Sequence, residues 1–117
     1  MSEQWLKVGE EEDFASGLHK VRVDKHEVVV ARLEGRLYAF DALCPHAGGP
    51  MELSELEGTV VSCPLHAWRF DVSRDGVESH GYRGLACRGV KAEGGGVYVS
   101  TVVPPRQMPQ RETSRAA

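Results

Sequence analysis

Two short motifs, C-x-H at residues 44–46 and C-x-x-H at residues 63–66, constrain the fold more than any other feature of this sequence. Their candidate ligands are Cys44, His46, Cys63 and His66, and 16 residues separate the two motifs. Thiolates and imidazoles bind soft and borderline metals, so the fold has to bring two loops together around a metal site. Gly48 and Gly49 closely follow the first motif and allow backbone N–H groups to approach a bulky group.

A structural zinc site with two Cys and two His ligands is one interpretation, because it uses the same residue types. The usual zinc pattern, however, pairs like ligands, opening with C-x₂₋₄-C and closing with H-x₃₋₅-H. Here each loop supplies one Cys and one His. A single zinc ion also rarely needs the room that two glycines provide, whereas bridging sulfides do. The mixed pairs therefore favour a cluster with two chemically different irons.

The full motifs, C-P-H-A-G-G and C-P-L-H-A-W-R-F-D, resemble the Rieske [2Fe–2S] motif, in which one iron has two Cys ligands and the other two His ligands. The resemblance implies one [2Fe–2S] cluster per chain. The implied ligands are Cys44 and Cys63 for one iron, and His46 and His66 for the other. It also implies an all-β fold, a Rieske-like β-sandwich with a small cluster-binding β subdomain. The cluster-binding loops would lie within about residues 41–71, and the sandwich would come from residues before Asp41 and after Arg88.

The sequence itself predicts β structure, because apolar and β-branched runs alternate with turn signals along the chain. The runs cover residues 5–8, 21–23, 28–33, 37–40, 60–63, 68–71 and 97–102. The nearly continuous apolar stretch 28–31 predicts a strand covered on both faces, whereas residues 10–16 favour only a short turn. We expect one domain over residues 1–103 and a flexible, proline-rich tail over residues 104–117.

The neighbours of the ligands indicate which kind of Rieske protein the chain resembles. High-potential, quinol-oxidising members resemble C-T-H-x-G-C and C-P-C-H-G-S-x-Y. Their extra Cys residues form a disulfide between the loops, and their Ser and Tyr hydroxyls donate hydrogen bonds to sulfur. At the corresponding positions this chain has Gly49, Leu65, Trp68 and Phe70, which supply neither the disulfide nor a hydroxyl. Fewer hydrogen bonds to sulfur leave the reduced state less stabilised, so we expect a reduction potential in the low part of the Rieske range.

What remains is a resemblance to the soluble Rieske ferredoxins of multicomponent aromatic and hydrocarbon oxygenase systems. It implies an electron carrier, not itself an enzyme, that passes single electrons from a flavin-dependent or iron–sulfur reductase to a terminal oxygenase. The alternative is an accessory subunit that resembles the small subunit of an assimilatory nitrite reductase. Such subunits often lack the cluster ligands, and this chain keeps all four, which favours the carrier.

The composition agrees with a cytoplasmic carrier. The first residues contain no apolar run long enough for a signal peptide or a membrane anchor, and an odd number of cysteines, three, fits a reducing compartment. Of 14 basic and 17 acidic residues, the tail holds three Arg and one Glu. Residues 1–103 therefore carry 11 basic and 16 acidic residues, a net charge of −5. That charge suits basic surfaces on redox partners and gives no indication of nucleic-acid binding.

Other side chains receive structural interpretations. Cys87 is expected to be a small, half-buried thiol rather than a ligand. Trp68 resembles an aromatic residue near the cluster of toluene monooxygenase ferredoxins, but a packing role is favoured, since large aromatic side chains usually pack. His19, His26 and His80 lie among polar residues and are expected at the surface.

Overall fold

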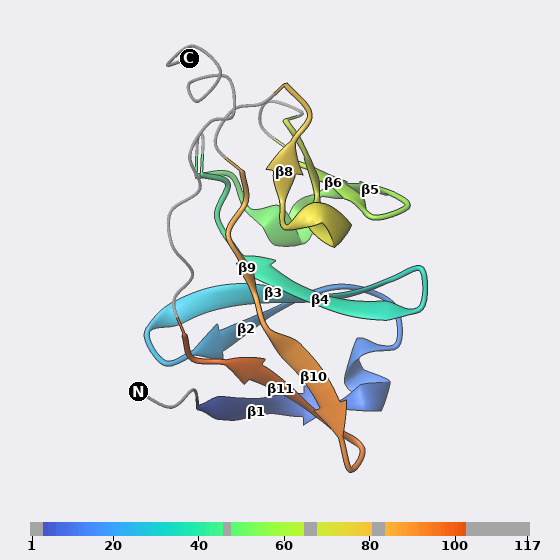
Figure 1. Cartoon of the computed structure of the whole chain (residues 1–117), viewed down its shortest axis with the longest axis vertical. Coiled ribbons are helices and arrows are strands. Elements are labelled where there is room, and N and C mark those ends of the chain that lie inside the picture. The colour runs from blue at the N-terminus through green and yellow to red at the C-terminus, as the bar shows by residue number, and fades with distance from the viewer. Residues whose placement is uncertain (1–3, 46–47, 65–67, 81–83, 103–117) are drawn as a thin grey trace.

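The computed structural model describes residues 4–45, 48–64, 68–80 and 84–102, which form three antiparallel sheets (Figure 1). The first sheet has the order β1 (Trp5–Glu10), β11 (Gly96–Ser100), β10 (Val90–Glu93). The second has the order β2 (Gly17–Val23), β3 (His26–Leu33), β4 (Arg36–Asp41), β9 (Cys87–Arg88). The third has the order β5 (Glu55–Glu57), β6 (Val60–Ser62), β7 (Arg69–Asp71), β8 (Val77–Glu78). Short 3₁₀ helices connect some of the strands: η1 (Glu11–Phe14), η2 (Met51–Leu53) and η3 (Val72–Arg74). Within the described ranges, no helix has the length and apolar character needed to cross a membrane.

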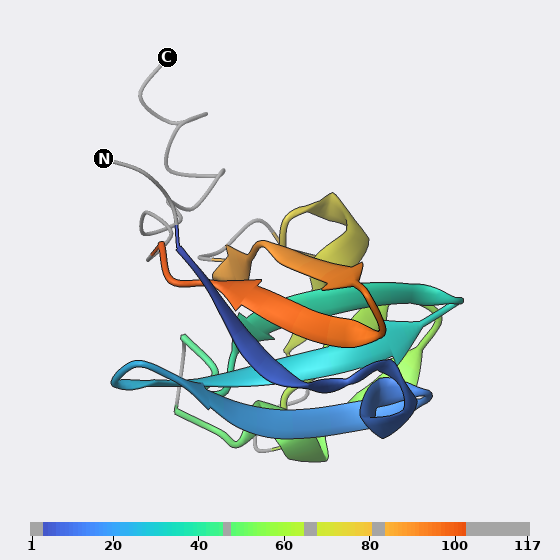
Figure 2. The same ribbon diagram turned by 90° about the horizontal axis from the view of Figure 1, so that it is seen from below.

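The second sheet lies in the middle of the molecule, between the other two (Figure 1). Figure 2 shows the first sheet lying across the strands of the second, and together they make the sandwich base. The core of this base is formed by Phe14, Val23, Val28, Val30, Ala39, Val97 and Val99. A second core joins the base to the third sheet and is formed by Val29, Ala31, Leu33, Phe40, Ala42, Cys44, Met51, Val61, Cys63, Phe70, Val72 and Leu85. The predicted all-β architecture, a sandwich with a small β subdomain, is confirmed.

Strand β3 contributes to both cores. Val28 and Val30 belong to the core of the base, while Val29 and Ala31 belong to the core beneath the third sheet, and all four are fully buried. Successive side chains of a strand point to opposite faces of the sheet, so both faces of β3 are covered. The prediction made from the continuous apolar stretch 28–31 is therefore confirmed.

The predicted apolar runs all contain strands, but four strands were not predicted: β5, β8, β9 and β10. The three residues of β5 are all exposed, and β10 is at most half-buried. A strand without a buried face shows no apolar alternation, so periodicity does not reveal it. The predicted turn over residues 10–16 contains η1, and the predicted tail over residues 104–117 lies outside the described residues.

Asp71 ends β7 and caps η3, where its Oδ1 accepts hydrogen bonds from Ser73 N at 3.1 Å, Ser73 Oγ at 2.7 Å and Thr59 Oγ1 at 2.8 Å. Replacing such a capping residue costs about 0.5–2 kcal/mol, which we expect for Asp71→Ala in urea unfolding near neutral pH. As a control, Glu93→Ala removes an exposed carboxylate that lies 3.7 Å from Lys91 and should cost less than about 0.5 kcal/mol. Equal losses in the two variants would contradict the capping role.

The Asp71 contribution also depends on pH. Partial burial acts to raise the pKa of Asp71, but the hydrogen bonds from Ser73 and Thr59 outweigh it and lower the pKa below its ordinary value. A carboxyl whose pKa is lower in the folded than in the unfolded state stabilises the fold above the unfolded-state pKa. That stabilisation is lost as the pH falls through the lowered pKa. The difference between wild type and Asp71→Ala should therefore shrink on acidification.

Candidate metal centre

Cys44 lies just beyond the end of β4, in a loop that folds back on itself. Its N–H donates to the Gly49 carbonyl oxygen at 2.9 Å, and the Gly48 N–H donates to the Cys44 carbonyl oxygen at 2.8 Å. An isolated bridge between Leu43 and Pro50 closes the base of the loop. Gly48 has a φ of +72°, in the left-handed region that favours glycine, so this glycine is needed for the shape of the loop.

Cys63 directly follows β6, at the base of the second motif. Its N–H donates to the Trp68 carbonyl oxygen at 2.8 Å, which closes the loop between β6 and β7. The pairing of these strands, with Val61 opposite Phe70, fixes where the loop begins and ends. The local β-hairpin therefore positions Cys63 in the core.

The structure brings Cys44 and Cys63 into one buried apolar core, together with Met51, Phe70 and Leu85. Among the described residues, neither cysteine forms a disulfide. Two buried sulfur donors at the bases of two closed loops are a donor set that fits the Cys half of a [2Fe–2S] site. The other two candidate ligands, His46 and His66, lie outside the described residues, as does Leu65.

The aromatic neighbours of the motifs are packing residues. Phe70 is fully buried in the core that contains both cysteines. Trp68 is half-buried and packs against the same core, as the packing interpretation predicted. Gly49 is buried as well. These residues line the ligand loops with apolar surface and present no hydroxyl group there.

A comparison with protein-family models decides the class of this centre. Residues 4–84 match the model described as the Rieske [2Fe-2S] domain. The chain belongs to the Rieske [2Fe–2S] domain family. Membership confirms the predicted cofactor, one [2Fe–2S] cluster per chain, in place of the zinc alternative.

Known relatives of this Rieske protein include ferredoxins of oxygenase systems. It is 37% identical over 73 residues to the ferredoxin component of naphthalene 1,2-dioxygenase/salicylate 5-hydroxylase systems from Ralstonia sp., covering 62% of this chain and 70% of the relative. It is 38% identical over 69 residues to the oxygenase component of 3-ketosteroid-9-alpha-monooxygenase from Rhodococcus rhodochrous, covering 57% of this chain. The chain spans only 18% of that larger relative.

A solved structure shows the same fold. In a complex of reduced oxygenase and oxidised ferredoxin from carbazole 1,9a-dioxygenase, one chain superimposes on this Rieske protein with a TM-score of 0.77 and 28% sequence identity. The match covers 86% of this chain and 96% of the other. The predicted resemblance to ferredoxins of oxygenase systems is confirmed.

Cys87 of the Rieske protein lies on β9 and is half-buried, as predicted. Burial is the main cause that raises the pKa of its thiol to about 12, and the nearby carboxylates of Asp75 and Asp41 add to the shift. Metals and electrophiles react with the thiolate, so a thiol with such a high pKa is a poor ligand at neutral pH.

Sequence reasoning did not predict an ion pair between β4 and β9, in which Arg88 is buried and Asp41 is partly exposed. The Arg88 side chain on β9 is buried, and its Nε lies 3.6 Å from Oδ1 of Asp41 at the end of β4. Partial burial raises the pKa of Asp41 above its ordinary value, although the positive charge of Arg88 opposes this. The pair joins the two segments that connect the third sheet to the base.

The three remaining histidines differ more than the sequence indicated. His26 is exposed, as predicted, but His19 is only half-exposed and packs edge-on against Phe14, with ring centroids 5.5 Å apart. His80 is exposed, yet it is hydrogen-bonded to the buried carboxylate of Glu78, which sequence reasoning missed. Glu78 is one of many acidic residues, and no local pattern marks it as buried.

Proposed function

We propose that this chain is a soluble, cytoplasmic electron carrier that takes single electrons from a flavin-dependent or iron–sulfur reductase and delivers them to a terminal oxygenase. The observation that carries the proposal is the pair of buried cysteines, Cys44 and Cys63, in one core of a Rieske fold. The ferredoxin relatives support the choice of partners. When bound, the [2Fe–2S] cluster supplies one-electron redox chemistry. A carrier needs no substrate site of its own, and we assign the chain no enzymatic activity.

We assign the ligands as Cys44 and Cys63 for one iron and His46 and His66 for the other. The two thiolates bring negative charge to the centre, whereas neutral imidazoles bring none. Met51, Phe70 and Leu85 surround the cysteines with fully buried apolar side chains, which keep water away from the thiolates. The backbone hydrogen bonds of Cys44 N–H and Cys63 N–H close the two loops, which supports the assignment of these cysteines as ligands.

The cheapest test of this function is the visible spectrum of the purified protein, with an EPR spectrum after reduction. Rieske absorption and a Rieske EPR signal are expected. After chemical reduction, mixing the chain with a protein electron acceptor should reoxidise it. A colourless protein that contains zinc or no metal would contradict the proposal and favour the accessory-subunit alternative.

We also expect a low reduction potential, because Phe70 and Trp68 have no hydroxyl group that could donate a hydrogen bond to sulfur. We expect a midpoint below about +100 mV, in the lower part of the Rieske range, from a redox titration. Phe70→Tyr adds a hydroxyl within the core of the two cysteines and should raise the midpoint. One hydrogen bond contributes roughly 0.5–1.5 kcal/mol, which corresponds to about 20–60 mV for one electron.

Phe40→Tyr is the matched control, since Phe40 is buried in the same core but lies on β4 in the base. It should leave the midpoint close to that of the wild type. A wild-type midpoint well above about +100 mV would show that the missing hydroxyls do not set the potential.

A further inference from the structure

A pocket of about 210 Å³ lies beside the second ligand loop. Its lining consists of Leu53, Glu55, Ser62, Cys63 and Pro64. Because only one of the two core cysteines lines it, the pocket lies on the outer side of the second loop rather than between the two loops. Its volume exceeds what one or two water molecules fill, so it has room for a long side chain.

Part of the lining is apolar and exposed. Leu53, at the end of η2, is 66% exposed, the highest value among the large apolar side chains that the structure describes as exposed. Pro64 is exposed as well and lines the same pocket. Single apolar side chains on a surface are ordinary, but two that share a pocket gain free energy when an apolar group covers them. This part of the lining favours an occupant with an aliphatic segment.

The rest of the lining is polar. Glu55 on β5 and Ser62 on β6 lie directly opposite each other in the antiparallel pair, so their side chains share one face of the sheet. Among the residues that the structure describes, neither the Glu55 carboxylate nor the Ser62 hydroxyl has a hydrogen-bond or ion-pair partner. Both groups can accept a hydrogen bond from a cation. This part of the lining favours a positively charged group.

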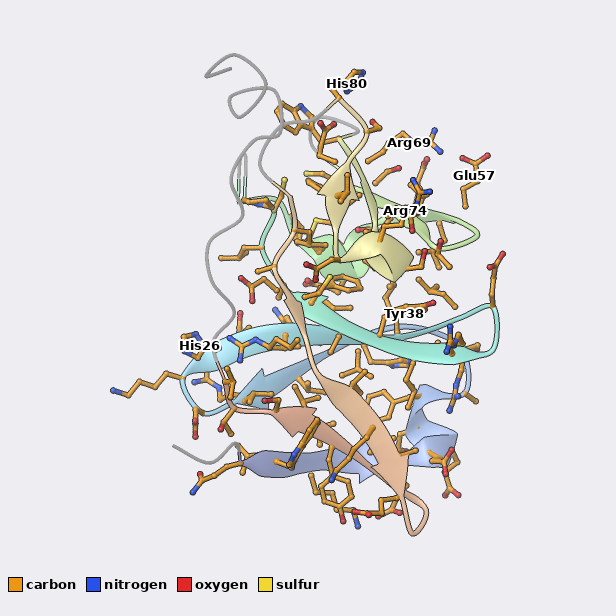
Figure 3. The ribbon with its side chains drawn as sticks, viewed as in Figure 1. His26, Tyr38, Glu57, Arg69, Arg74 and His80 are labelled. Carbon is orange, nitrogen blue, oxygen red and sulfur yellow. The ribbon has the colours of Figure 1, made fainter. Side chains whose placement is uncertain are left out.

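Charged neighbours of the pocket are paired with one another. Arg69 on β7 lies on the same face of the sheet as Glu55, but its guanidinium group forms an ion pair with Glu57 (Figure 3). The carboxylate of Glu52 lies 3.5 Å from Nζ of Lys20. These two pairs are neutral, and of the lining residues Glu55 alone is charged. The local charge that a partner meets at this pocket is therefore the negative charge of Glu55.

We propose that the pocket receives a lysine or arginine side chain of a redox partner protein. Its aliphatic part packs on Leu53 and Pro64. Its charged end binds the Glu55 carboxylate and the Ser62 hydroxyl. The proposal rests on the proposed function as an electron carrier. Lysine and arginine fit because a long aliphatic stem carries their charge only at its end, whereas an apolar side chain would leave the carboxylate without a partner. Since Cys63 lines the pocket, this contact holds the partner beside the second ligand loop.

Carbodiimide cross-linking to cytochrome c, a lysine-rich haem protein, tests the contact directly. The carbodiimide activates a carboxylate, and a lysine amine in contact with that carboxylate displaces the activating group and forms an amide bond. Peptide mapping of the product should place a cross-link at Glu55. Glu55→Gln should lower the yield of cross-linked product about fivefold. Glu12→Gln, which removes an exposed carboxylate on η1 in the base, should leave the yield close to that of the wild type.

Stopped-flow reduction of cytochrome c by the reduced chain measures the same contact during electron transfer. At low ionic strength, Glu55→Gln should lower the second-order rate constant about fivefold, the upper end for one exposed ion pair. Leu53→Ala should lower it by a smaller factor, because it removes only part of the apolar lining. Leu56→Ala is the matched control, since it truncates another exposed leucine on the opposite face of β5 and should keep the wild-type rate.

Three measurements separate a lost contact from a structural defect. The visible spectrum, the midpoint potential and the rate of reduction of ferricyanide, a small acceptor that needs no docking pocket, should stay close to the wild-type values in every variant. Leu53 and Glu55 are exposed, so their replacement should have little effect on folding.

Three results would overturn the proposal. Cross-links at other carboxylates with Glu55 unmodified would place the contact elsewhere. A wild-type rate with cytochrome c in Glu55→Gln would show that this carboxylate binds no partner lysine. An equal loss with ferricyanide and cytochrome c would place the effect at the cluster. In each case the proposed function stands, whereas a wild-type protein that reduces neither acceptor would contradict the proposed function itself.

Discussion

Cys44→Ser and Cys63→Ser are expected to yield protein without the visible absorption of a [2Fe–2S] cluster and with close to no bound iron, against about two irons per chain in the wild type. Both cysteines are buried in the core beneath the third sheet, so a lost ligand is not replaced by one from the surface. Metal binding and folding are linked, and these variants should also unfold at lower urea concentration. Iron analysis, absorbance and EPR of the reduced protein measure the effect.

Cys87→Ser is the matched control for these ligand variants. Cys87 is the third cysteine of the chain, and its high pKa makes it a poor ligand. The Cys87→Ser protein should keep the cluster with its full iron content. A cluster that survives Cys63→Ser but is lost in Cys87→Ser would show that the ligand assignment is wrong.

Gly76→Ala is expected to be among the most destabilising single substitutions in the chain. A Cβ at this position would lie 2.0 Å from the Leu85 carbonyl oxygen, and Gly76 has a φ of +78°. The two backbones are already in contact, since the Leu85 N–H donates to the Gly76 carbonyl oxygen at 2.9 Å. Overpacking costs roughly 1–3 kcal/mol and left-handed backbone about 1–2 kcal/mol, so urea unfolding should show a loss of about 2–5 kcal/mol.

Gly95→Ala separates the two contributions. Gly95 has a similar φ of +85°, but nothing lies within 4 Å of the Cβ that alanine would add. This control should lose only the conformational part, about 1–2 kcal/mol. Because Leu85 belongs to the core of the two cysteines, Gly76→Ala should also bleach faster than Gly95→Ala during incubation in air. Equal stabilities in the two variants would contradict the predicted backbone clash.

The sequence predicted those parts of the fold that depend on local patterns. The unbroken apolar run 28–31 predicted a strand that is buried on both faces. The two motifs predicted that Cys44 and Cys63 lie in one site. Strand β5 was not predicted, because its residues are all exposed and show no apolar alternation. The sequence signals only the turn that follows it. The division into a base and a small subdomain came from the family resemblance, because periodicity does not reveal which strands share a sheet.

The predictable part of the site is the set of candidate ligands, because their residue types and spacing form the two motifs. The pairing of Asp41 with Arg88 was not predictable, since these residues are distant in the sequence and only the β4–β9 pairing brings them together. The burial of Glu78 depends on the whole third sheet and its packing. His46 and His66 lie outside the described residues, and their role as ligands stays a prediction.

The shared strand β3 also has a consequence for how members of this family can diverge. Positions 28 and 30 face the core of the base, while positions 29 and 31 face the core that contains the cysteines. Side chains at positions 28 and 30 can therefore change together with residues of the sandwich. Those at positions 29 and 31 can change together with residues of the metal-binding end. We expect substitutions at 29 and 31 in homologues to accompany changes around Met51 and Phe70, and those at 28 and 30 to accompany changes around Val97.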